Sequence, residues 1–192
     1  MKPIKPFILA SASPRRRELL FSCGLIFEVC PAEINEDMLV GENPEEYVRR
    51  VAESKALAVK EKFPKSPILA ADTVVVLDNT LFGKPRDQKE AFLMLRTLAG
   101  AGHLVITAFS LLCPMEQEPL TESVISEVIF RELGDLEIET YLKTGESMDK
   151  AGAYAVQGQG IFLIKEVAGS LTNVVGLPLK EVLAALEKHL GF

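Results

Sequence analysis

The sequence has no apolar run near the roughly 20 residues that a membrane-spanning helix needs. Its N-terminal stretch holds only a short apolar run at residues 7–10, far shorter than the apolar segment of a secretory signal peptide. We therefore expect a soluble, cytoplasmic protein that does not contact a membrane.

Cysteine and histidine are scarce. The three cysteines, Cys23, Cys30 and Cys113, are odd in number and widely spaced. They show neither a disulfide framework nor the spacing of a metal motif, and neither His103 nor His189 has a ligand-like neighbour along the sequence. This pattern argues strongly against a zinc site built from cysteine and histidine.

Repeats, low-complexity segments and obvious linkers are also absent, so we expect a single domain over residues 1–192. The net charge is −6, with 21 basic and 27 acidic residues, which argues against an extended nucleic-acid-binding surface. Any anion site must then be a local basic cluster in an acidic protein.

Apolar runs alternate with helical patterns along the whole chain. The predicted strands are 5–10, 25–30, 67–76, 103–113, 123–131 and 160–166, and the predicted helices are 14–23, 44–62, 88–99, 135–143 and 178–190. Asn43 opens the second helix, Asp87 and Glu90 predict a capping box for the third, and Asp78-Asn79 predicts a hairpin turn. This order predicts an α/β fold, with a mixed sheet covered by helices and ligands bound where strands turn into helices.

The stretch LASASPRRRELL, residues 9–20, places three arginines where a helix is expected to begin. Ser13 reads as the N-cap and Pro14 as the first helical residue. Cations at a helix N-terminus cost about 0.3–1 kcal/mol each, so a plain solvated face is an unfavourable use of them. A bound phosphate would reverse that cost, because backbone N–H groups, serine hydroxyls and arginine all donate to its oxygens.

Two further polar residues interrupt apolar patterns. Lys55 lies inside the apolar stripe of its predicted helix, where it either extends past an edge or meets a buried negative group. Asp72 interrupts the strand-like run ILAADTVVV, so it is either a turn residue or a carboxylate that binds Mg²⁺ or activates water.

Three weaker signals complete the set. Lys84 lies in GKP, which on its own is more often a surface loop. Gln157 follows a stretch rich in small residues and could bind a base edge through its amide. The acidic segment EINED, residues 33–37, is either a solvated loop or a source of a metal ligand.

Eight short stretches of the chain, taken in order over residues 8–179, resemble the Maf family of nucleotide pyrophosphatases. They are LASASPRRRELL, INE, AESKA, ADTVV, GKP, HLVITA, DKAGAYAVQG and NVVGLPL. The resemblance implies a mixed, twisted sheet flanked by helices with a cleft between two lobes, related to the inosine triphosphate pyrophosphatases. It implies a homodimer that hydrolyses a nucleoside triphosphate to the monophosphate and pyrophosphate with Mg²⁺ or Mn²⁺. A role in clearing unwanted nucleotides and an association with septum formation are also implied.

Two of these motifs, Asp72-Thr73-Val74 and Lys150-Ala151-Gly152-Ala153-Tyr154 with Gln157, are similar to those of the branch of the family that acts on dTTP and UTP. The resemblance implies that Asp72 is the proton acceptor and that Arg15, Thr73 and Gln157 choose the substrate. The phosphate-contacting positions are Ser11, Arg16, Lys55 and Lys84, and the metal ligands are Asp72 and Glu36, with Glu33 still possible.

Two alternatives remain open at this point. The same reaction could act on a purine nucleotide or 7-methyl-GTP, which a substrate panel would show. The chain could instead be a nucleotide-binding regulator of septum formation with little turnover, which a pyrophosphate-release assay would show.

Overall fold

The computed structural model describes residues 6–191, so the start of the strand expected at 5–10 lies outside the described residues. The described residues form two compact units. Unit 1 takes in the described parts of Met1–Asp72 and Gly176–Phe192 together with Thr107–Val124. Unit 2 consists of Thr73–Ile106 and Ile125–Val175.

The strands within residues 6–191 form one mixed sheet of seven strands, in the order β2-β1-β3-β5-β6-β7 with β4 paired to β3. β1 runs parallel to both β2 and β3, whereas the β3–β4 and β6–β7 pairs are antiparallel. The strands are β1 (Phe7–Leu9), β2 (Phe27–Val29), β3 (Ile68–Leu77), β4 (Thr80–Phe82), β5 (Gly102–Leu112), β6 (Leu120–Phe130) and β7 (Ile164–Ala168). The mixed α/β fold predicted from the sequence is confirmed.

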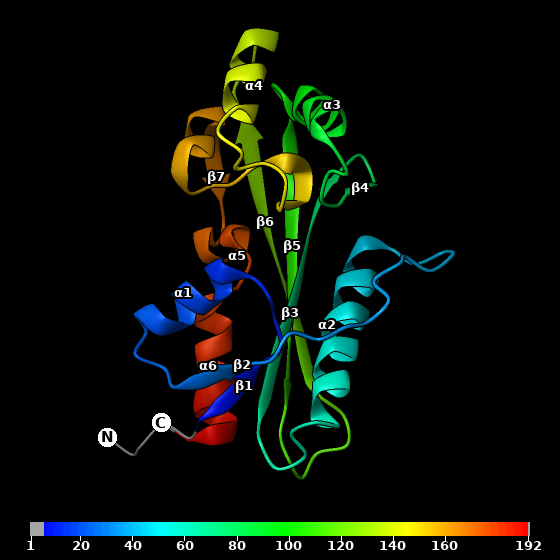
Figure 1. The fold of residues 1–192 in the computed structure, drawn as a ribbon, viewed down its shortest axis with the longest axis vertical. Coiled ribbons are helices and arrows are strands. Elements are labelled where there is room, and N and C mark those ends of the chain that lie inside the picture. Colours follow the sequence, from blue (N-terminus) through cyan, green and yellow to red (C-terminus); the bar gives the residue numbers. More distant parts are fainter. Residues whose placement is uncertain (1–5, 192) are drawn as a thin grey trace. The chain divides into compact units, whose positions relative to one another are not determined.

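Helices cover both faces of the strands of unit 1. Side chains alternate between the two faces along β1 and β3, so each strand contributes apolar residues to both sides. α2 (Pro44–Lys60) covers one face, while α1 (Pro14–Ser22) and α6 (Leu179–Leu190) cover the other (Figure 1). Ile68 and Ala70 of β3 pack with the α2 side, and Leu69 and Ala71 pack with the α1 and α6 side. This alternation decides which helix each following β3 residue meets.

Four of the five predicted helix starts are confirmed, and α6 begins at Leu179, one residue later than predicted. Asn43 caps α2 through a reciprocal bond with Glu46, as a capping box requires. Asp87 accepts from the backbone N–H of Glu90 at the start of α3 (Gln88–Leu98). The Glu90 carboxylate, however, bonds the backbone N–H of Arg86 at 2.6 Å. The return bond of this box therefore reaches one residue further back than predicted.

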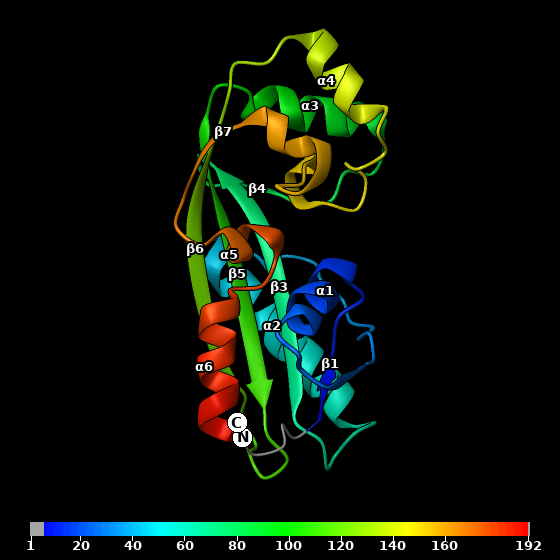
Figure 2. The same ribbon diagram turned by 90° about the vertical axis from the view of Figure 1, so that its left-hand side faces the viewer.

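Unit 2 holds α3 and α4 (Asp135–Leu142) side by side (Figure 2). It also holds the 3-10 helices η1 (Ala151–Ala153) and η2 (Gly158–Leu163), and the short helix α5 (Leu171–Val175). The hairpin turn predicted at Asp78-Asn79 is confirmed, since both residues have positive φ and β4 follows them.

The strand predicted at 160–166 is wrong over its first half. Residues up to Leu163 belong to η2, and β7 begins at Ile164. The cause lies in the backbone at Gly160, where a Cβ would come within 2.1 Å of the Ala155 carbonyl oxygen. Only glycine permits this folded-back path, which the apolar run alone did not indicate.

In the part of the chain that the structure describes, every helix is too short or too polar to cross a membrane.

Candidate active site

Lys55 and Asp72 form a buried ion pair in unit 1. Asp72 follows Ile68 and Ala70 by the alternation of β3, so its side chain emerges on the face that α2 covers. There the Nζ atom of Lys55 donates to Oδ1 of Asp72 at 2.8 Å. Both side chains are 11% exposed. The charge on the apolar stripe of α2 thus meets a buried negative group, which is one of the two readings that the sequence left open.

Glu36 adds a second carboxylate to the same ammonium group. Its Oε1 atom lies 2.9 Å from Lys55 Nζ, and its side chain is 47% exposed. Of the two acids that the sequence left open as metal ligands, Glu36 is therefore the one that reaches Lys55. Two carboxylates against one ammonium leave an excess negative charge on hard oxygen atoms, which is the donor chemistry that Mg²⁺ and Mn²⁺ prefer.

The segment carrying Glu36 is held in place by α2. The hydroxyl of Tyr47 donates to the Glu36 carbonyl oxygen at 2.8 Å, and Arg50 donates to the Asp37 carbonyl oxygen at 2.9 Å. Burial raises the pKa of Tyr47 to about 12, and the charges of Asp72 and Glu36 add to the rise. Tyr47 thus stays protonated and able to donate. The sequence analysis missed this residue, although it lies two helical turns before Lys55 on the same face.

Arg16 is not a solvated residue at the start of α1. It is 8% exposed, and its guanidinium donates to the carbonyl oxygens of Gly176 and Ala71, both at 2.7 Å, and to Ser11 Oγ at 3.1 Å. Burial lowers its pKa, and the charge of Asp72 opposes that shift. Arg16 therefore ties the end of β1 to β3 and to Gly176, a structural role that the sequence did not predict.

The neighbouring arginines differ from Arg16 in exposure. Arg17 is exposed and Arg15 is half-buried. Ser13 is the N-cap residue of α1 and Pro14 its first residue, as predicted, but the Ser13 side chain makes no capping bond. The Ser13 backbone N–H instead bonds Ser11 Oγ at 3.3 Å. Ser11 is thus a shared contact between the turn and Arg16.

The remaining predicted site residues belong to unit 2. Thr73 follows Asp72 in β3 and is half-buried, whereas Lys84 and Gln157 are exposed. The loops carrying Lys84 and Gln157 are joined by a bond from the Gly152 N–H to the Gly83 carbonyl oxygen at 3.1 Å. The structure thus gathers Ser11, Arg16, Glu36, Lys55 and Asp72 in unit 1 and brings two predicted loops together in unit 2.

The sequence is similar to known proteins over nearly its whole length. A family model described as "Maf-like protein" matches residues 6–189. A dTTP/UTP pyrophosphatase of Geobacter sp. (strain M21) is 48% identical over 179 residues, covering 93% of each chain. A dTTP/UTP pyrophosphatase of Anaeromyxobacter dehalogenans (strain 2CP-1) is 50% identical over 190 residues, covering 96% of this chain and 94% of the relative. One of Clostridioides difficile (strain 630) is 45% identical over 182 residues, covering 95% and 94%.

Proposed function

The chain belongs to the Maf family, and from this premise we propose that it is a nucleoside triphosphate pyrophosphatase acting on dTTP and UTP. It hydrolyses each to the monophosphate and pyrophosphate, a reaction on a phosphorus-containing anhydride. Relatives that share 45–50% of its residues over nearly their whole length carry that activity in their names. In the structure, the observation that carries the proposal is the convergence of Asp72 and Glu36 on the buried Lys55.

Asp72 acts as the proton acceptor for the attacking water. Its carboxylate keeps one oxygen on Lys55, so the other is the group that orients the water and takes its proton. The water oxygen forms a new bond to phosphorus, the α–β anhydride bond breaks, and pyrophosphate leaves with the bonding electrons. Lys55 fixes the orientation of the Asp72 carboxylate through its hydrogen bond to Oδ1.

Basic groups balance the charge of the triphosphate and of the leaving pyrophosphate. We assign phosphate contacts to Ser11, Arg16, Lys55 and Lys84. Three hydrogen bonds hold the Arg16 guanidinium in place. A donor fixed in this way is already oriented before the phosphate binds. Lys84, which is exposed, contributes a mobile charge instead.

A divalent cation, Mg²⁺ or Mn²⁺, is part of the proposal. Glu36 and Asp72 would hold it, because both carboxylates lie against Lys55 and their combined negative charge exceeds its single positive charge. When bound, the ion supplies charge neutralisation for the phosphate oxygens.

Substrate choice is assigned to Arg15, Thr73 and Gln157. A uracil or thymine edge offers two carbonyl acceptors around one N–H donor, which suits an amide that both donates and accepts. The Gln157 side chain is exposed and has both groups to offer.

Three further properties complete the proposal. The family match runs through both units, which supports one Maf-like domain over residues 1–192. We also propose that the protein is a cytoplasmic homodimer that clears non-standard or surplus nucleotides. A role in septum formation beside catalysis would not conflict with these assignments.

The decisive experiment is product analysis with dTTP, UTP, CTP, ATP, GTP and 7-methyl-GTP under Mg²⁺. We expect pyrophosphate and monophosphate from dTTP and UTP in preference to the other four. If GTP or 7-methyl-GTP is hydrolysed best, the assignment to the dTTP/UTP branch fails, but the assignment as a pyrophosphatase stands. If every nucleotide binds and none is hydrolysed, the chain is a nucleotide-binding regulator and the enzymatic proposal fails.

A further inference from the structure

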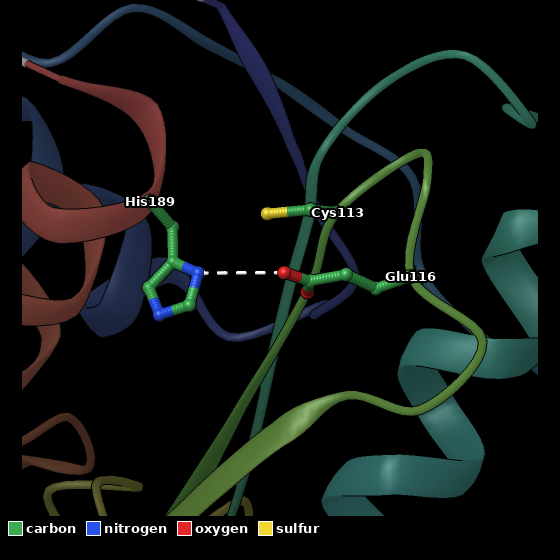
Figure 3. A group of neighbouring side chains, drawn as sticks. All are labelled: Cys113, Glu116 and His189. Carbon is green, nitrogen blue, oxygen red and sulfur yellow. Dashed lines mark ion pairs between the residues drawn. The ribbon is translucent and has the colours of Figure 1, made fainter.

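A second group of ligand-type side chains lies in unit 1 and shares no residue with the candidate active site. The Cys113 sulfur, a Glu116 carboxylate oxygen and a His189 ring nitrogen all lie within 4.8 Å of one another (Figure 3). Neither histidine has a ligand-like neighbour along the sequence, but in the structure His189 has two, Cys113 and Glu116. The sequence could not show this grouping, because His189 is far along the chain from the other two residues.

The fold places these three side chains through a tight turn and the end of a helix. Cys113 directly follows β5, and the Glu116 backbone N–H bonds the Cys113 carbonyl oxygen at 3.0 Å. His189 lies in the last turn of α6. Lys60, the last residue of α2, donates to the Glu116 carbonyl oxygen at 2.6 Å and so fixes the turn from another side.

The distances are close to those that a four-coordinate metal needs. Bonds of about 2.0–2.3 Å in a tetrahedral site place neighbouring ligand atoms roughly 3.5 Å apart. His189 Nδ1 and Glu116 Oε1 are already 3.5 Å apart. Since all three ligand atoms lie within 4.8 Å of one another, each pair is within about 1.3 Å of the separation that such a site needs.

The apolar surroundings favour a defined site over a loose surface cluster. Cys113 packs against the core formed by Phe7, Leu111 and Leu190 among others. This packing holds the sulfur between the β5 end and α6, and the half-buried His189 and Glu116 leave one side open to water.

We propose that Cys113, Glu116 and His189 bind a thiophilic divalent transition metal, with Zn²⁺ as the natural occupant and water in the fourth position. On binding, the thiol proton and any proton on Nδ1 pass to solvent, and the sulfur and nitrogen lone pairs form the metal bonds. Thiolate and imidazole select zinc over magnesium, whereas the oxygen atoms of Glu36 and Asp72 select the reverse. The metal would link the β5–β6 turn to the C-terminal helix.

The test uses Co²⁺ as a spectroscopic probe, with Mg²⁺ in excess to occupy oxygen-only sites. The wild-type protein is expected to show a sulfur-to-cobalt charge-transfer band, which oxygen ligands cannot produce. Cys113→Ser and His189→Gln should lose or weaken the band, and Cys23→Ser, at an exposed cysteine elsewhere, should keep it. A wild-type protein without the band, or a band that Cys23→Ser abolishes instead, overturns the proposal.

Zn²⁺ affinity and thermal stability give a second readout. Loss of a direct ligand should weaken Zn²⁺ binding by more than about 100-fold, the upper range for merely supporting residues. Zn²⁺ should raise the melting temperature of the wild type and of Cys23→Ser but not of the two ligand variants. If Cys113→Ser fails to fold, His189→Gln alone decides, and equal affinity in that variant and the wild type contradicts the site.

Discussion

The ammonium group of Lys55 lies 2.8 Å from the Asp72 carboxylate, and each side chain is only 11% exposed. At this burial neither charge could be left alone without a large desolvation cost. Breaking the pair should therefore destabilise unit 1, and the pair also fixes one oxygen of the proposed catalytic carboxylate. Changes to either partner should separate into effects on stability and effects on rate.

Replacing Asp72 with asparagine should abolish most turnover of dTTP. The amide keeps the shape and can still contact Lys55 through its carbonyl oxygen, but it cannot accept the proton of the attacking water. We expect kcat to fall about 10²–10⁴-fold, the usual contribution of a general base. Steady-state kinetics measure the loss. Asp78→Asn, in the exposed β3–β4 turn, is the matched control, and an Asp72→Asn enzyme above a tenth of the wild-type kcat would disprove the role.

Replacing Lys55 with methionine should destabilise the protein as well as weaken nucleotide binding. Methionine fills the space but leaves Asp72 buried without its cation, which costs about 3–5 kcal/mol for a broken buried pair. Urea unfolding measures the free energy. The double variant Lys55→Met/Asp72→Asn should unfold at a higher urea concentration than Lys55→Met, since its buried carboxylate is gone. Equal midpoints for the two would mean that the pair is energetically unimportant.

Arg16 and Arg17 should differ sharply although they are adjacent. Arg16→Ala removes two hydrogen bonds from a charged donor to buried carbonyl oxygens, and each such bond contributes about 1.5–3 kcal/mol. Arg17→Ala changes an exposed side chain and should stay within about 0.5 kcal/mol of the wild type. Thermal or chemical unfolding compares them. Similar stabilities for both variants would show that the bonds of Arg16 carry no net stabilisation.

Burial of His103 should make the protein less stable in mild acid. The ring lies 1% exposed in unit 2, its Nε2 atom 2.8 Å from the Tyr154 hydroxyl, and burial lowers its pKa from 6.5 to about 4. The unfolded chain therefore binds a proton at this residue between about pH 6.5 and pH 4, where the folded chain does not. Stability attributable to His103 is complete above pH 6.5 and falls as the pH approaches 4, by about 3 kcal/mol in total.

The comparison of the wild type with His103→Gln isolates this effect, because the carboxylates titrate alike in both proteins. The wild type should lose more stability than the variant between pH 6.5 and 4 in urea unfolding. Parallel pH profiles would show that His103 is protonated in the folded state without cost.

Residues whose neighbours are set by a repeating pattern were predictable from the sequence. Asp72 interrupts the apolar pattern of β3 and Lys55 interrupts that of α2, so each could be picked out as a candidate site residue by itself. The alternation of β3 then places Asp72 on the face that α2 covers. The cap at Asn43 and the turn at Asp78 were predictable because each depends only on residues next to it in the sequence.

Residues fixed by contacts between distant segments were not predictable. Arg16 bonds carbonyl oxygens of Ala71 and Gly176, and every residue offers such a carbonyl, so no sequence signal marks them. The grouping of His189 with Cys113 has the same origin. Residues near Gly160 read as a strand because an apolar run carries no information about the backbone contact that bends it.

Base choice can be tested with two glutamines at the start of η2, the N-cap residue Gln157 and the helical residue Gln159. Gln157 and Gln159 are both exposed, but only Gln157 is among the residues to which we assign substrate choice. A site that hydrogen-bonds the uracil edge disfavours cytosine, because cytosine presents a donor where uracil presents an acceptor. Gln157→Ala should therefore lower kcat/KM for dTTP and UTP by about tenfold or more while changing CTP little, as expected for loss of one good hydrogen bond. Gln159→Ala should leave the ratio of UTP to CTP unchanged. If both variants lower kcat/KM equally for dTTP, UTP and CTP, this segment supports nucleotide binding in general and Gln157 does not distinguish the bases.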